Sequence, residues 1–207
     1  MWRHEEVVCH SCEFHLPETN FHLDPENPVA RLFWGRAGLE GAAAYLYFNK
    51  RNRVQRLVHQ LKYKGRKDIG IWLGARYGRI LCNFAPFNTA DLIIPVPLHK
   101  KRYMQRGYNQ SEQFALGLAL PMKIPVDNHL VARTRATETQ TRKSRFSRYQ
   151  NVREIFTVGN PGSFRGMHLL LVDDVITTGA TLESCIQALS AIPEVRVSVA
   201  CIAAAMI

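Results

Sequence analysis

The sequence predicts an α/β fold: a mostly parallel, twisted sheet with flanking helices, preceded by a small irregular N-terminal segment. Three observations support this prediction. Strand and helix patterns alternate along residues 91–207, an order typical of a parallel sheet. The run at 168–172 is apolar after its histidine, as in a central strand that is buried on both faces. Residues 1–34 instead hold four histidines, two cysteines and three prolines, with little regular apolar periodicity.

The first half of the chain contains two expected strands with two helices between them. Residues 42–48 are apolar and aromatic and fit a strand. A helix follows, because four apolar residues recur at the i, i+3, i+4 and i+7 spacing of one helical face: Val54, Leu57, Val58 and Leu61. Gly65 is expected to end this helix. A second helix is expected around 69–81, and a short buried strand at 91–97 ends at prolines.

The second half is expected to supply the central strands. A basic loop at 98–109 leads into a helix near 110–120. A long polar segment at 133–153 comes next, and segments of this length inside a compact domain are usually functional lids or disordered. A strand at 155–158 then precedes the central one. Helical spacing returns in Leu182, Cys185, Ile186 and Leu189, and alternation at 195–201 predicts the last strand.

The size and composition of the chain bound its class. At 207 residues and 46% hydrophobic content, we expect one core with a small appendage, divided into residues 1–34 and 35–207. No stretch approaches about 18 consecutive apolar residues, so no membrane span is expected. The N-terminus lacks the charged-then-apolar layout of a secretory signal, which predicts a cytoplasmic protein.

Positive charge is concentrated in three segments of the chain, whose formal net charge is +10. Residues 49–67 hold eight Lys and Arg and no acid, residues 99–106 hold four, and residues 133–153 hold seven against the single Glu138. Together these segments carry 19 of the 27 basic residues. Such clustering predicts an anionic partner: a polyphosphate, a nucleotide or a nucleic acid. Charge alone does not choose between a small anion and a strand.

Two carboxylates and a threonine-rich turn stand together where the central strand is expected to end. Asp173 and Asp174 follow the apolar run directly, and Thr177-Thr-Gly-Ala-Thr181 opens the next helix. Hydroxyls and free N–H groups at a helix N-terminus form an anion cradle, and Gly179 lets the backbone approach a phosphate. The carboxylates could accept hydrogen bonds from vicinal hydroxyls or help to hold a hydrated Mg²⁺. Ordinary capping explains any one of these residues, but it explains the combination poorly.

The run 169–181 resembles the signature that binds 5-phosphoribosyl-1-pyrophosphate (PRPP) in type I phosphoribosyltransferases. The resemblance implies that Asp173 and Asp174 hold the ribose hydroxyls. It implies that the 5′-phosphate is held by the following turn: Ile176, Thr177, Thr178, Gly179, Ala180 and Thr181. It further implies an enzyme that transfers the phosphoribosyl group and releases pyrophosphate with Mg²⁺ as cofactor. The acceptor is not identified by any residue.

Further segments are similar to the ComF/GntX-like branch of that family, which is associated with competence. They are Leu61-Lys-Tyr-Lys-Gly65, Ile94-Pro-Val-Pro-Leu98, Arg106-Gly-Tyr-Asn-Gln110, and Arg133-Thr-Arg135 with Gln140 and Arg145. The resemblance covers about residues 40–204. In this fold a hood of variable segments selects the acceptor, which here implies residues 49–81 and part of the N-terminus. Tyr63, Trp72 and Tyr77 could stack on a base there, although aromatics at helical spacing are more often part of the core.

The departing pyrophosphate needs cationic groups in a site that water does not reach. In the loop after the strand at 91–97, the candidates are Lys100 and Arg102, with Arg106 in support. The 133–153 segment would be the flexible loop that closes over PRPP, and it offers Arg142, Lys143 or Arg145. For each of these residues the alternative is a solvated loop charge.

Cys9-His-Ser-Cys12 has the spacing of half a zinc site. The branch usually carries an N-terminal finger with two such pairs, and this chain has one. Either the first pair is missing, or histidines complete the site, for which the local candidates are His4, His10, His15 and His22. Zinc at Cys9 and Cys12 is therefore left open.

Three functions are compatible with the sequence. The first is a Mg²⁺-dependent phosphoribosyltransferase with an unknown acceptor. The second is a module that binds PRPP or a nucleotide without transfer, and the third is an accessory that handles single-stranded DNA in DNA uptake. The last is implied by the branch, and stacking aromatics beside basic residues would suit it. We expect no membrane partner, and a homodimer is left open.

Overall fold

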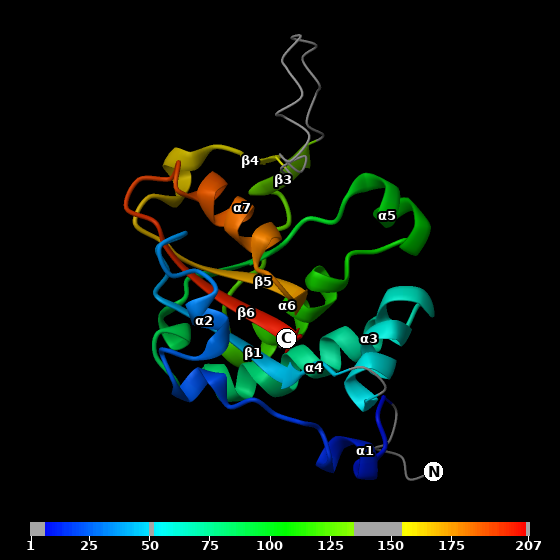
Figure 1. Cartoon of the computed structure of the whole chain (residues 1–207). Coiled ribbons are helices and arrows are strands. Elements are labelled where there is room, and N and C mark those ends of the chain that lie inside the picture. Colours follow the sequence, from blue (N-terminus) through cyan, green and yellow to red (C-terminus); the bar gives the residue numbers. More distant parts are fainter. Residues whose placement is uncertain (1–6, 50–51, 135–154, 206–207) are drawn as a thin grey trace, which may run out of the picture.

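The computed structural model describes residues 7–49, 52–134 and 155–205. Its centre is a four-stranded parallel sheet in the order β1-β6-β5-β2, and a two-stranded antiparallel sheet pairs β3 with β4 (Figure 1). The strands are β1 (Gly41–Tyr47), β2 (Leu92–Pro95), β3 (Val131–Thr134), β4 (Ile155–Val158), β5 (His168–Ile176) and β6 (Arg196–Ala204). The predicted α/β class with a mostly parallel sheet is confirmed.

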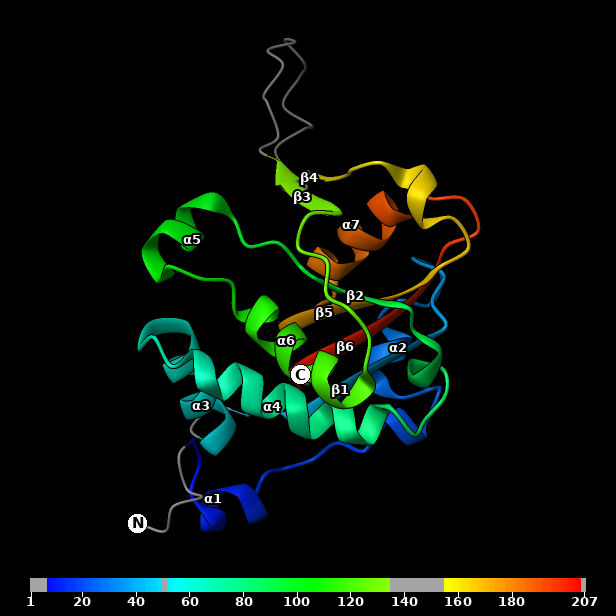
Figure 2. The same cartoon turned by 180° about the vertical axis from the view of Figure 1, so that it is seen from behind.

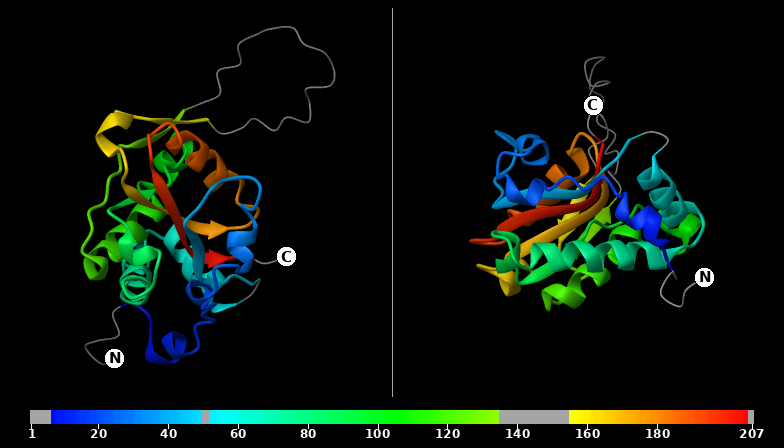
Figure 3. Two further views of the ribbon diagram at one scale, coloured as in Figure 1. Left: turned by 90° about the vertical axis from the view of Figure 1, so that its left-hand side faces the viewer. Right: turned by 90° about the horizontal axis from the view of Figure 1, so that it is seen from below.

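Helices cover both faces of the parallel sheet. The α-helices are α1 (His10–Phe14), α2 (Pro28–Arg31), α3 (Arg53–Tyr63), α4 (Lys67–Leu81), α5 (Lys100–Arg106), α6 (Gln110–Met122) and α7 (Ala180–Leu189). Helices α4 and α6 lie on one face, and α7 and α2 lie on the other (Figures 1 and 3). Short 3-10 turns occur at Phe21–Leu23, Phe87–Thr89 and Pro161–Phe164. In the part of the chain that is described, none of these helices has the length and apolar content needed to cross a membrane.

Strand β5 is the centre of the sheet and pairs in parallel with both β6 and β2. The side chains of Leu169 to Val172 have no solvent exposure, which agrees with the continuous apolar run. The strand does not end at Val172 as expected but continues to Ile176, because Asp173 and Val175 keep their pairing with Cys201 and Ala203 of β6. The two acids therefore lie inside the strand, close to its carboxyl end.

The N-terminal segment closes the outer edge of the sheet. The Thr19 amide donates to the Tyr45 carbonyl at 2.9 Å, and the Tyr47 amide donates to the Pro17 carbonyl at 2.9 Å. The buried Asn27 amide group donates to the Ala42 carbonyl at 2.7 Å. Several residues before position 35 are buried in the same core as the sheet: Leu16, Phe21, Val29, Ala30 and Phe33. The division of the chain near residue 34 stays a prediction.

Helices α4 and α6 pack backbone against backbone beneath the sheet. A Cβ atom on Gly74 of α4 would overlap the Phe114 carbonyl oxygen and lie 2.8 Å from the Leu118 amide nitrogen. No side chain larger than hydrogen fits there, so this glycine sets the distance between the helices. Because Ser111 lies on α6, this helix contact also positions the Ser111 hydroxyl, which donates a hydrogen bond to Asp173 of β5.

The basic segment at 98–109 was expected to be a loop, and this prediction is wrong. Most of it forms α5, where the His99 ring accepts a hydrogen bond from the Lys101 amide at 3.2 Å. The run from Lys100 to Arg106 consists largely of good helix formers. None of its residues is buried, so the helix has no apolar periodicity by which the sequence could have indicated it.

Candidate functional site

The segments that the sequence singled out gather at the carboxyl ends of the parallel strands. Helix α3 follows β1, α5 follows β2 and α7 follows β5, so all three begin from one edge of the sheet (Figures 1 and 2). Ligands of open α/β sheets bind at this edge. The topology therefore places the acid pair, the threonine-rich turn and two basic helices around one region.

The two acids of β5 are each held by a side chain from another helix. The Ser111 hydroxyl of α6 donates to Oδ1 of Asp173 at 2.8 Å, and the Asp174 amide donates to the same oxygen at 2.8 Å. The Lys62 ammonium of α3 donates to Oδ1 of Asp174 at 2.8 Å, and the Val175 amide donates to it at 2.6 Å. These bonds fix both carboxylates before any ligand arrives.

The pKa of Asp173 is raised to about 7, first because the carboxyl group is buried and second because the Asp174 carboxylate lies next to it. The hydrogen bond from Ser111 opposes this shift. Near neutral pH the Asp173 carboxyl therefore exists in both protonation states, so it can accept a hydrogen bond or donate one. Such a shifted pKa at a strand end is typical of a functional site.

The turn after β5 forms a small cradle. Gly179 is the N-cap of α7 with φ +76°, and because it has no side chain it cannot itself cap the N–H groups of the first turn. A hollow of about 50 Å³ is lined by Asp173 and by residues 175–182. Thr177 and Thr178 are exposed beside it. A phosphate-sized anion fits this arrangement, because N–H groups and the helix dipole both favour negative charge.

The N-terminal segment supports the cradle from behind. A Cβ atom on Gly179 would lie 3.4 Å from the Phe33 ring, so the turn rests on that side chain. The Arg36 guanidinium forms an ion pair with Glu183 in the first turn of α7 and donates to the Thr178 carbonyl at 3.4 Å. Arg36 was not predicted from the sequence, because no local pattern connects it with a turn 142 residues later.

Three of the four segments that resemble the ComF/GntX-like branch, at 61–65, 94–98 and 106–110, are joined by contacts to one another. The Tyr108 phenol donates to the Leu61 carbonyl, and the Asn109 amide group donates to the Val96 carbonyl at 2.9 Å. The Arg106 guanidinium lies 5.1 Å from the centre of the Tyr63 ring. Residues 106–110 thus tie the end of α3 to Val96, the residue that follows β2. Lys62, which was not predicted as a site residue, comes from the first of these segments.

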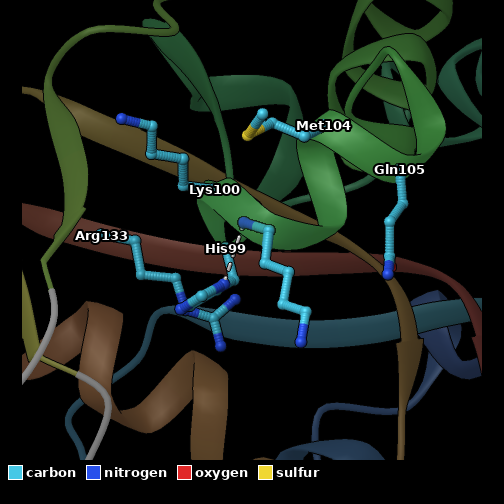
Figure 4. A pocket seen from close by; sticks show the side chains of 6 residues that line it. His99, Lys100, Met104, Gln105 and Arg133 are labelled. Carbon is cyan, nitrogen blue, oxygen red and sulfur yellow. Dashed lines mark hydrogen bonds between the residues drawn. The ribbon is translucent and has the colours of Figure 1, made fainter.

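A second and larger cleft, of about 760 Å³, lies between α5 and β3 (Figure 4). The described residues that line it include cations and no carboxylate: His99, Lys100, Lys101, Met104, Gln105 and Arg133. Figure 4 shows these side chains projecting around the cleft. We name it the α5 cleft.

Of the residues expected to bind pyrophosphate, Lys100 lines the α5 cleft, whereas Arg102 is exposed outside its lining. Arg106 is already engaged, because it donates to the Gln110 side chain at 2.6 Å and covers Tyr63. Their roles stay predictions. The residues expected in the flexible loop lie outside the described residues: Arg142, Lys143 and Arg145.

The three aromatic candidates for the acceptor site differ in burial. Tyr77 is buried and stacks on Tyr45 with 4.9 Å between ring centres, so it belongs to the core. Trp72 is half-buried, with the Arg76 guanidinium 5.2 Å from its ring centre. Of the three, Tyr63 is largely exposed, and it follows Lys62, whose ammonium bonds Asp174.

The cysteine pair lies at α1, with Cys9 at the N-cap and Cys12 inside the helix. A hydrogen bond between the two thiols raises the pKa of Cys12. The nearby histidines have other neighbours: His15 bonds the Ser11 carbonyl at 2.7 Å, and His22 lies 4.8 Å from Phe84 between ring centres. Within residues 7–49, 52–134 and 155–205, no three His, Cys, Asp or Glu side chains are placed to hold a metal ion. His4 lies outside these ranges.

Comparison with known proteins gives three kinds of match. A phosphoribosyl transferase domain matches residues 109–206. The DNA utilization protein YhgH of Shigella flexneri is 32% identical over 198 residues, which cover 90% of this chain and 79% of that protein. Competence protein ComFC of Bacillus subtilis is 34% identical over 193 residues, covering 86% of this chain and 75% of that protein.

Among solved structures, the adenine phosphoribosyl transferase from Trypanosoma brucei matches with a TM-score of 0.44 at 14% identity, covering 76% of this chain and 70% of that chain. The family assignment rests on the sequence relatives, which match most of this chain and most of their own length. The chain belongs to the ComF-like branch of the type I phosphoribosyltransferase family.

Proposed function

We propose that this chain binds PRPP on β5 and the turn before α7, and transfers its phosphoribosyl group to an acceptor with release of pyrophosphate. One observation carries the proposal: a preorganised carboxylate pair and a helix N-terminus that begins at a glycine share one end of the same strand. The first suits vicinal ribose hydroxyls, and the second suits the 5′-phosphate.

In this proposal the ribose lies between the acids and the cradle. Asp173 and Asp174 accept hydrogen bonds from its hydroxyls, and the turn from Ile176 to Thr181 binds the phosphate. The C1–O bond breaks, and its electron pair leaves on pyrophosphate. A lone pair of the acceptor forms the new bond to C1, and the acceptor's proton passes to pyrophosphate or solvent. Positive charge that develops at C1 is stabilised by the acids.

Mg²⁺ fits this site as a companion of the ligand. Carboxylate oxygens are ligands that Mg²⁺ accepts, and it commonly binds through one or two carboxylates together with substrate phosphates. Asp173 and Asp174 would help to hold it, and it would neutralise phosphate charge when bound. Zinc at Cys9 and Cys12 is not supported, because among the described residues no further His, Cys, Asp or Glu side chain joins the two thiols to hold a metal ion.

The test replaces both carboxylates by amides of the same shape, Asp173→Asn with Asp174→Asn. Calorimetric titration with Mg-PRPP should show no binding, because each lost charge-assisted hydrogen bond costs about 1.5–3 kcal/mol. Glu194→Gln is the control, since this exposed acid pairs with Arg165 on the surface and, within the described residues, with no other cation. Unchanged affinity in a folded double variant contradicts the proposal.

A second candidate is binding without transfer, in an accessory role on single-stranded DNA. The observation that favours it is α5, whose Tyr103 and Met104 are 49% and 77% exposed among basic residues. Aromatic faces beside cations suit bases and phosphates of a single strand. The names of the relatives, which refer to DNA utilization and competence, agree with such a role.

The variant Tyr103→Ser separates the two candidates. Loss of a stacked base should weaken binding of a fluorescein-labelled single-stranded oligonucleotide about 10-fold, as measured by anisotropy. PRPP binding should not change, because Tyr103 lines neither hollow. Phe14→Ser is the matched control, since Phe14 is an exposed aromatic on α1. Equal oligonucleotide binding by both variants and the wild type would leave α5 without a role on DNA.

A further inference from the structure

The Lys62 ammonium is part of the site around the acids. Its Nζ atom lies 2.8 Å from Oδ1 of Asp174, and the two side chains are only 21% and 14% exposed. A charge in this position has lost most of its water, so it interacts strongly with whatever lies beside it.

The position of α3 does not depend on this ion pair. The helix buries Val54, Val58 and Leu61 in the core. The residues on both sides of Lys62 are also held, since the Leu61 carbonyl accepts from the Tyr108 phenol and the Arg106 guanidinium covers the Tyr63 ring. The main chain is thus fixed by its neighbours, and the Lys62 side chain is presented to the site.

The ammonium has donors left for a ligand. It carries three N–H groups, and within the described residues one of them is used, by Asp174. Lys62 also approaches the acids from the side of α3, whereas the phosphate cradle is on the side of α7. Figures 1 and 2 show these helices on opposite sides of the carboxyl end of β5. A ribose with its 5′-phosphate on the cradle therefore turns its C1 end toward Lys62.

We propose that Lys62 is a ligand-binding residue, whose ammonium is oriented by Asp174 and contacts the pyrophosphate on C1 of PRPP. This inference rests on the proposed PRPP site. It assigns the pyrophosphate a cation from the hood, in addition to those of the α5 cleft. The competing view is that the ion pair only links α3 to β5.

The affinities of two ligands distinguish these views. PRPP and ribose 5-phosphate share the ribose and the 5′-phosphate, but only PRPP carries pyrophosphate. Calorimetric titration at one Mg²⁺ concentration would give the ratio of their affinities for wild type, Lys62→Met and Lys62→Arg. Lys64→Met is the matched control, because Lys64 is exposed two residues later and its removal changes the net charge equally.

Lys62→Met should weaken PRPP binding about 10- to 100-fold, the range of a charge-assisted hydrogen bond, and change ribose 5-phosphate binding little. Lys62→Arg should keep the ratio of PRPP affinity to ribose 5-phosphate affinity close to that of the wild type, and Lys64→Met should leave this ratio unchanged.

If the ion pair only links α3 to β5, Lys62→Met should weaken the binding of both ligands equally or of neither, and that result overturns the proposal. If Lys62→Met does not fold, the same two affinities are measured for Lys62→Gln and their ratio is compared with that of the wild type. A wild type that binds neither ligand removes the PRPP site itself, whereas binding with an unchanged ratio removes only the role of Lys62.

Discussion

The cradle before α7 and the α5 cleft both suit anions, but they are built differently. In the cradle, Gly179 rests on Phe33, Arg36 braces Thr178, and the neighbouring acid Asp173 is bonded to Ser111. The α5 cleft is larger and cationic, and no residue of α5 is buried. The first site is fixed by its surroundings, and the second consists mainly of charge on an exposed helix.

The two sites should therefore differ in how selectively they bind anions. A fixed set of donors and acceptors recognises one shape, because a ligand that fits poorly leaves buried groups without partners. Exposed lysines attract any phosphate and lose much of that effect in salt. We therefore expect the cradle to select a ribosyl phosphate, and the α5 cleft to accept pyrophosphate or a nucleic-acid strand.

Among the variants that test this comparison, Gly179→Val should have the largest effect, because it disturbs the support of the cradle without removing a donor. Gly179 has φ +76°, which a β-branched residue rarely adopts, and the new side chain would press on Phe33. PRPP binding should fall by more than about 10-fold. Gly166→Val is the matched control, because Gly166 has φ +72° with open space around it. Equal PRPP affinity for the two variants in calorimetry would show that the shape of the turn does not matter.

A smaller loss of PRPP affinity is expected from Arg36→Met, which removes only the bonds from the N-terminal segment to the cradle. The loss of its bonds to Thr178 and Glu183 should weaken PRPP binding about 3- to 10-fold, as one or two exposed hydrogen bonds would. Arg31→Met is the control, since Arg31 lies in the same segment but pairs with Glu26. If both variants bind PRPP alike, the N-terminal segment does not support the cradle.

The sequence indicated what repeats locally and missed what meets only after folding. The apolar run and the acid–threonine string predicted β5 and the cradle, because each feature lies within a few residues. Lys62 and Asp174 are 112 residues apart, and no periodicity shows that α3 faces β5. Helix α5 was missed for the opposite reason: its propensity is local, but nothing in it is buried. The helical spacing of the aromatic residues likewise did not indicate that Tyr77 is buried and Tyr63 is exposed.

The smallest predicted effect concerns stability and the protonation of Asp173. Its pKa rises on folding to about 7, so its contribution to stability is present below the unfolded value of about 3.9 and is lost as pH rises through 7. At pH 8 the folded protein holds a buried second carboxylate, and Asp173→Asn removes that charge but keeps an oxygen for Ser111. Without ligand, the variant should melt higher than wild type at pH 8, on the order of 2–4 °C, and the gap should close toward pH 5. Burial lowers the pKa of His168, which reduces stability on acidification, but both proteins share this effect and the difference cancels it. If the wild type melts at a higher temperature than Asp173→Asn at pH 8 in calorimetry, the charged Asp173 carboxylate does not destabilise the ligand-free protein. The carboxyl end of β5 would then be no more constrained than the α5 cleft.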